Sequence, residues 1–227
     1  MTHGEFKTIE NHMLSLMRDS AHDKHHVYRV LYSAVDIAKC ENGVDTDVLL
    51  AACLLHDIGR QREFENPNLC HAQEGGNMAF DFLLTLSWGR QKALHVKDCI
   101  SSHRYRDDNP PETIEAKILF DADKLDASGA MGIARTLLYH GQVSTALYLL
   151  GDDGEIPTES TDAATSSFFQ EYNYKLKNLY GSFHTERAEQ IAAKRQQTAE
   201  TFYNGLFDEI AQNYRTGTDV LNSLLNK

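Results

Sequence analysis

The sequence predicts an all-α protein, and three observations favour that class. Apolar residues recur at helical spacing along most of the chain, almost no stretch alternates with period two, and only four prolines occur in 227 residues. A hydrophobic fraction of 41% is enough to bury a sizeable core. The length suits one large helical domain, or one domain with an extension.

Composition and charge limit the classes of function. The 22 basic and 33 acidic residues give a net charge of −11, which argues against nonspecific binding to nucleic acid or to a membrane surface. An anionic substrate would therefore need a local positive site, such as a metal ion. The four cysteines form no CxxC pair, and neither a signal sequence nor a membrane-length apolar run is visible. We expect a cytoplasmic protein.

Three helices are expected in the first quarter of the chain. The first is amphipathic over about 9–17, and the second runs over about 23–38 with Asp23 as its N-cap. The third opens at 45–47 and is strongly apolar until it reaches the pair His56-Asp57 in its last turn. Gly59 stands where a C-terminal cap would be.

The rest of the chain follows the same pattern. Residues 60–70 contain polar groups and Pro67, so they are expected to form a loop beside the His-Asp pair. Gly151 to Gly154, followed by Pro157, is the best candidate linker. Further helices are expected from near His71 to a break at 87–89, from about 94 to near His103, from Glu112 into the acids at 121–126, around 133–138, and over 162–180 and 186–213.

The His56-Asp57 pair is the first candidate site. An unpaired charge at the end of a buried helix would be costly, and a divalent cation would remove that cost. Neutral imidazole and carboxylate are good ligands for Zn, Mn, Fe or Co. A hydrogen-bonded core histidine beside a capping carboxylate would give the same dipeptide, so the pair alone does not decide the matter.

Three other segments have the same chemistry. His26 and Arg29 share one helical face in the second expected helix. In the acidic run, Asp123 and Asp126 share a face while Asp121 points elsewhere, and such clustered acids repel unless a cation or Lys124 compensates. Two isolated histidines, His71 and His103, stand at helix ends.

These residues and their flanks resemble the H…HD…D pattern of the HD-domain metal-dependent phosphohydrolases. The matching stretches are "HVYRV" from His26, "AACLLHDIGR" around His56-Asp57 and "AKILFDADKLDASGA" around Asp123. The sequence is most similar to a bacterial branch with nucleoside triphosphate pyrophosphohydrolase activity. The likeness covers about residues 20–135, which implies an HD-type helical core there and a C-terminal helical extension over about 155–227, within one domain spanning 1–227.

The resemblance implies a set of site residues. The metal ligands would be His26, His56, Asp57 and Asp123. Asp121 competes for the last place, but Asp123 has the small residue before it and the basic-apolar pair after it that are typical of the family. Candidate acids, bases and charge-balancing groups are Asp57, Lys124, Arg29 and Glu74.

The substrate contacts are predicted separately. We expect His71 and His103 to contact phosphates, with a second metal ion as the alternative role. Lys175 and Arg195, in a weaker "KL…T…R" match, would grip the outer phosphates of a nucleoside triphosphate.

The predicted function is therefore hydrolysis of a (deoxy)nucleoside triphosphate to a monophosphate and pyrophosphate. The cofactor would be a divalent ion: Mn, Mg, Co, Ni, Fe or Zn. The partners expected are a small-molecule nucleotide and, for a homodimer, a second copy of the chain. Alternatives are a nucleotide phosphodiesterase or monophosphatase, a di-iron oxygenase, or a noncatalytic HD signalling module.

Overall fold

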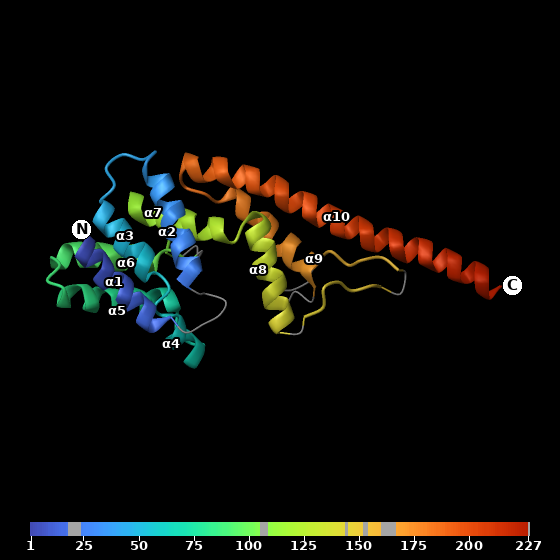
Figure 1. The fold of residues 1–227 in the computed structure, drawn as a ribbon, viewed down its shortest axis with the longest axis horizontal. Coiled ribbons are helices and arrows are strands. Elements are labelled where there is room, and N and C mark those ends of the chain that lie inside the picture. The colour runs from blue at the N-terminus through green and yellow to red at the C-terminus, as the bar shows by residue number, and fades with distance from the viewer. Residues whose placement is uncertain (18–23, 105–108, 144, 152–153, 160–166, 227) are drawn as a thin grey trace. The chain divides into compact units, whose positions relative to one another are not determined.

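The computed structural model describes residues 1–17, 24–104, 109–143, 145–151, 154–159 and 167–226. The all-α prediction is confirmed, because the described residues contain helices and only one isolated parallel bridge, between Ala146 and Ser167 (Figure 1). The chain forms two compact units. The first comprises Met1–Asp126 and Phe183–Glu189, and the second comprises Ala127–Ser182 and Gln190–Lys227. The expected extent of a single domain stays a prediction.

The first unit is built around one apolar helix, α3. Its helices are α1 (His3–Leu16), α2 (Lys24–Ala38), α3 (Thr46–Leu55), α4 (Arg60–Glu65), α5 (His71–Thr85), α6 (Arg90–Ser101) and α7 (Ile114–Asp126). Asp45 caps α3 by accepting hydrogen bonds from the backbone of Asp47 and Val48. Seven of the ten α3 residues are buried, and α3 packs against α1, α2, α5, α6 and α7. A helix that is apolar on all sides belongs in the centre of a bundle.

The His-Asp pair lies just after α3, whereas the sequence predicts it within the last turn of that helix. α3 ends at Leu55, so His56 and Asp57 stand in the turn after it rather than in its last turn. Gly59 is not a left-handed cap, since its φ is −82° and it precedes α4. A glycine is required for another reason: a Cβ at position 59 would lie 2.2 Å from the carbonyl oxygen of His71. The turn is thus packed directly on the start of α5.

The expected loop at 60–70 is partly helical. Residues Arg60–Glu65 form α4, and only 66–70 connect it to α5. The expectation of a loop was wrong because Pro67 ends the helix instead of preventing it, as residues before a proline leave helical conformation. The predicted N-cap Asp23 lies outside the described residues. The helices expected from His71 and from Glu112 are present as α5 and α7.

The second unit has its own core. It contains α8 (Gly129–Gln142), α9 (Phe168–Glu171), a π-helical turn (Tyr172–Leu176), a 3₁₀ turn (Lys177–Gly181) and most of α10 (Glu186–Leu225). The regular helix expected over 162–180 is replaced, in its described part, by these three short segments, and 162–166 lie outside the described residues. The helix expected over 186–213 continues to Leu225. The buried core residues are Ile133, Ile156, Phe168, Phe169, Tyr172, Leu176 and Ala199.

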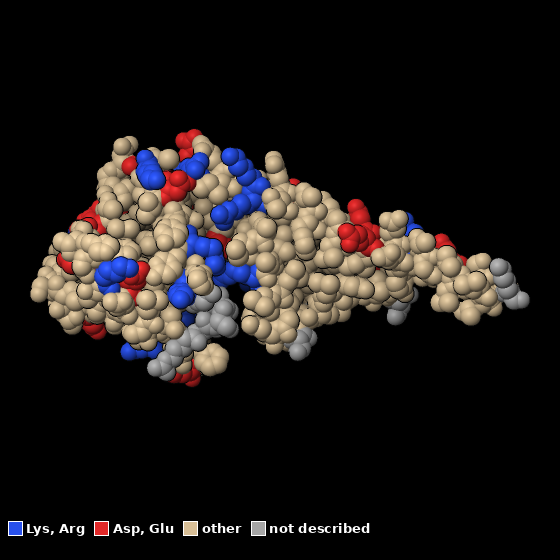
Figure 2. All heavy atoms as spheres, in the orientation of Figure 1, with Lys and Arg blue, Asp and Glu red and all other residues tan. Residues whose placement is uncertain are grey.

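Charged groups are spread over the surface of the first unit. On the face drawn in Figure 2, lysine, arginine and acidic side chains lie side by side on this unit, whereas the C-terminal half of α10 shows few charges. Among the described helices, none combines the length and apolar character needed to cross a membrane.

Candidate metal centre

The first group of ligand atoms joins three helical segments. His26 comes from the first turn of α2, His56 follows α3, and Asp123 lies on α7. His26 Nε2 is 3.2 Å from His56 Nε2 and 3.3 Å from Asp123 Oδ1. One atom from each of the three side chains lies within 4.8 Å of the others, which is the spacing of ligands around one ion. The Asp123 side chain is 26% exposed, so this group reaches solvent on its α7 side.

A second group surrounds the other end of the Asp57 carboxylate. Asp57 Oδ2 lies 3.5 Å from His26 Nε2 and 3.6 Å from His56 Nε2. Asp57 Oδ1 lies 3.8 Å from His71 Nε2 and 3.7 Å from His103 Nε2. Asp57, His71 and His103 are all buried and form a second set of three atoms within 4.8 Å of one another. Asp57 therefore stands between two candidate ion positions with one oxygen toward each.

Hydrogen bonds fix the orientation of the imidazole rings. His56 Nδ1 is 2.8 Å from the carbonyl oxygen of Cys53, and His103 Nδ1 is 2.6 Å from that of Ile100. A carbonyl only accepts, so Nδ1 carries the proton in both rings, and a neutral ring then keeps a lone pair at Nε2.

The same reasoning applies to the other two histidines. Their Nδ1 atoms face carboxylates, at 2.8 Å from Asp126 for His26 and 2.7 Å from Glu63 for His71. All four Nε2 atoms point toward Asp57 and Asp123. The Nε2 of His71 and the Oδ2 of Asp57 are buried without a hydrogen-bond partner. A cation would satisfy these two buried acceptors, and this observation shows that the residues fit a divalent metal.

The charges in the cluster support the same conclusion. Burial lowers the pKa of His56 to about 4 and, with the nearby Arg60, that of His71 to about 4, so both rings are neutral at pH 7. Burial opposes protonation of His26 too, but hydrogen bonds to Asp123, Asp126 and Asp57 raise its pKa to about 11. A proton on His26 thus offsets the carboxylates when no cation does so.

The HD domain family matches residues 24–128. The uncharacterized protein YpgQ of Bacillus subtilis is 31% identical over 193 residues, covering 82% of this chain and 84% of YpgQ. The chain belongs to the HD-domain family.

Solved structures of HD-domain proteins agree with the fold. A crystal structure of YpgQ in complex with ADP has a TM-score of 0.70 and 28% identity, covering 90% of this chain and 97% of that one. A structure of an HD-superfamily hydrolase from Bacillus thuringiensis has a TM-score of 0.69 and 25% identity, covering 91% of this chain and 96% of that one.

Behind the histidines, this HD domain has supporting groups whose contacts the sequence did not predict. Asp126 holds His26 Nδ1 and is itself bound by Arg29, with Nε at 2.6 Å and Nη2 at 3.0 Å. Arg29, predicted to balance the charge of the phosphates, is thus a partner of Asp126. The spacing of Asp123 and Asp126 on α7 was the signal for this role, since both share the face toward His26.

α4 supplies a second set of supporting groups. Glu63 accepts from Arg104 at 2.9 Å as well as holding His71, and Arg60 Nε donates to Asp57 Oδ1 at 3.0 Å. Burial opposes ionisation of Asp57, but the neighbouring His56 and Arg60 hold its pKa well below the usual range. These roles were missed because residues 60–70 were interpreted as a loop.

Two other predicted residues of the first unit, Glu74 and Lys124, have the following contacts. The Glu74 carboxylate binds Arg62 at 2.8 Å. The Lys124 ammonium lies over the Phe120 ring, 4.3 Å from its centroid, and burial lowers the pKa of Lys124 to about 8. Their predicted roles stay predictions.

Asp121 faces away from both groups. Its buried carboxylate accepts from the backbone of His184 at 2.9 Å, and from the backbone and hydroxyl of Thr185 at 2.8 and 2.7 Å.

The predicted cations of the C-terminal part belong to the second unit. Lys175 pairs with Glu171 at 3.1 Å, and Arg195 Nη1 is 3.5 Å from the Ser128 hydroxyl.

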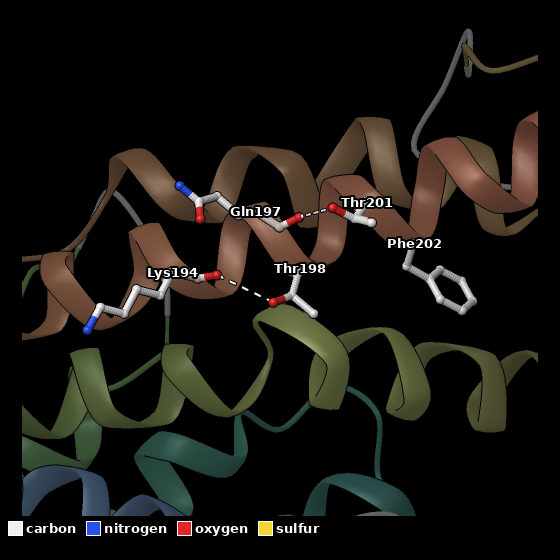
Figure 3. Close-up of a pocket in the computed structure, with 5 residues that line it drawn as sticks. All are labelled: Lys194, Gln197, Thr198, Thr201 and Phe202. Carbon is white, nitrogen blue, oxygen red and sulfur yellow. Dashed lines mark hydrogen bonds between the residues drawn. The ribbon is translucent and has the colours of Figure 1, made fainter.

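A shallow hollow on α10 is drawn in Figure 3. Two of its hydroxyls donate to their own helix, Thr198 to the carbonyl of Lys194 and Thr201 to that of Gln197. No cluster of ligand atoms lines it among the described residues, so the candidate site is the histidine cluster. The hollow is lined by Lys194, Gln197, Thr198, Thr201 and Phe202.

Proposed function

We propose that this HD-domain protein is a metal-dependent phosphohydrolase that acts on nucleoside triphosphates and releases pyrophosphate. The observation that carries the proposal is the convergence of four imidazole Nε2 atoms on the carboxylates of Asp57 and Asp123. The buried acceptors His71 Nε2 and Asp57 Oδ2, which have no hydrogen-bond partner, favour a ligand set for divalent ions over a hydrogen-bonded core. The ADP in the YpgQ crystal structure supports a nucleotide as the ligand.

We propose two ion positions. His26, His56 and Asp123 would hold one ion, His71 and His103 the other, and Asp57 would contribute an oxygen to each. A divalent ion held in this way polarises a phosphoryl oxygen and lowers the pKa of a water molecule. The buried acceptor at His71 Nε2 favours this arrangement over direct phosphate contact by His71, because a neutral ring with its proton on Nδ1 has no donor to offer a phosphate.

The protein's own cations would stabilise the phosphates. Arg60 lies beside Asp57, and its Nη1 lies 3.9 Å from Glu63 Oε2, but its side chain is 29% exposed and can therefore meet an anion from solvent. Arg104, which binds Glu63, adds a second guanidinium near His71. Guanidinium groups one phosphate away from the reacting one stabilise a pyrophosphate leaving group as its charge develops. Their presence supports cleavage between the α and β phosphates.

Product identification tests this function. The protein is incubated with each dNTP and Mn²⁺, and the products are followed by phosphorus NMR. Equal amounts of nucleoside monophosphate and pyrophosphate are expected. Inorganic phosphate with a diphosphate, or hydrolysis of monophosphates alone, would contradict cleavage at this position. Failure to hydrolyse any nucleotide with Mn²⁺, Mg²⁺, Co²⁺ or Ni²⁺ would favour a noncatalytic HD module.

A further inference from the structure

An exposed aromatic ring lies next to the candidate site. Phe64, on α4, is 85% exposed, the highest value for any large apolar side chain in the described part of the chain. A ring left in water forgoes the free energy of burial. Its position on the helix that supports the site makes this exposure informative.

Phe64 lies on the site-facing side of α4. Positions 60, 63 and 64 share one helical face, being spaced i, i+3 and i+4. Arg60 on that face donates to Asp57, and Glu63 accepts from His71 and Arg104. Phe64 is four residues, or about 6 Å, further along the helix than Arg60. The face therefore runs from the candidate ion positions through the guanidinium groups to an open aromatic ring.

We propose that Phe64 is the platform on which the base of the nucleotide stacks. This inference rests on the proposed function, which places the phosphates against the candidate ion positions and the exposed part of Arg60. A nucleotide held there by its phosphates carries its base outward, and a flat apolar ring one turn away matches that end of the ligand. Every base presents a π-face, so such a platform gives affinity without choosing among bases. The ring carries no hydrogen-bonding group that would read a base edge.

Binding of ADP and of pyrophosphate, measured by calorimetry in Mn²⁺, separates the base from the phosphates. We expect wild-type protein to bind ADP more tightly than pyrophosphate. Phe64→Ala should weaken ADP binding by about 5- to 150-fold, the range for loss of one stacked base. Pyrophosphate binding should be unchanged. Phe64→Trp should retain ADP affinity, whereas Phe64→Leu, which keeps an apolar group without the ring, should not.

A matched control is Tyr32→Ala, which removes another exposed aromatic side chain, 67% exposed, from α2. It should leave both affinities unchanged. The proposal is overturned if Phe64→Ala weakens ADP and pyrophosphate equally or weakens neither, or if wild-type protein binds the two ligands with the same affinity. These outcomes do not depend on turnover, so they are distinct from a failure of the NMR test above.

Discussion

Two faces of α7 carry carboxylates with different purposes, although the residues are only two positions apart. Asp123 faces the Nε2 atoms of His26 and His56, at 3.3 and 3.9 Å, in the cluster where the buried acceptors of Asp57 and His71 have no hydrogen-bond partner. Asp121 faces the turn before α10, where three donors satisfy it. The difference teaches that the partner atoms, and not the local sequence, separate a candidate ligand from a structural carboxylate. Both acids follow the same apolar run.

The largest expected effect comes from Asp123. Asp123→Ala removes the carboxylate of the first ligand group, so bound Mn²⁺ and nucleotide hydrolysis should both fall to background while the chain stays helical. Metal content by plasma mass spectrometry, activity and circular dichroism are the measurements. His56→Ala should behave alike. The assignment of Asp123 as ligand and Asp121 as structural carboxylate would be contradicted if Asp121→Ala abolished metal binding while Asp123→Ala did not.

Asp121→Ala should instead destabilise the protein. The change leaves the backbone and hydroxyl donors of Thr185 buried without an acceptor, which costs about 3 kcal/mol of unfolding free energy. Urea denaturation measures the loss, and metal content per folded molecule should be retained.

The control is Asp36→Ala. Asp36 forms an ion pair at the surface with Arg187, which lies two residues after Thr185. Its cost should be about 0.5 kcal/mol, as for an exposed ion pair. If Asp121→Ala and Asp36→Ala lowered the free energy of unfolding by the same amount, Asp121 would not have the structural role assigned to it.

Asp126→Asn tests whether Asp126 orients the His26 ring for metal binding. The amide would no longer serve as a charged acceptor for both His26 and Arg29, so the imidazole would lose its fixed orientation. We expect Mn²⁺ affinity to fall about 10- to 100-fold, as for other groups that orient a ligand. An affinity within twofold of wild type would show that Asp126 has no orienting role.

The last expected effect is a pH dependence. The three acids around His26 raise its pKa to about 11, so metal must displace a proton from this ring. The protonated form is favoured as pH falls, and Mn²⁺ affinity should therefore increase with pH, about tenfold per unit for one proton released. His56 and His71, with pKa values near 4, add nothing between pH 6 and 9. An affinity independent of pH in that range would contradict this charge balance.

The sequence was sufficient for the fold class and for the residues that carry the family pattern. Periodicity identified α3 and α7, because a helix buried on one or more sides repeats its apolar residues regularly. It could not identify the contacts of Glu63 and Arg60, which depend on how α4 packs against α5. Nor could periodicity predict that Arg29 donates a hydrogen bond to Asp126, which lies 97 residues away in the sequence. The irregular turns at 172–181 also escaped, since a π turn carries no distinct pattern.

Two ions sharing Asp57 form the central claim, and crystals grown with Mn²⁺ test it most directly through anomalous scattering. We predict two manganese peaks about 3.5–4 Å apart. One should be bound by His26, His56 and Asp123, and the other by His71 and His103, with Asp57 reaching both. A single peak at the first position, with His71 and His103 contacting a bound phosphate instead, would contradict the claim and restore the role that the sequence first suggested for these two histidines.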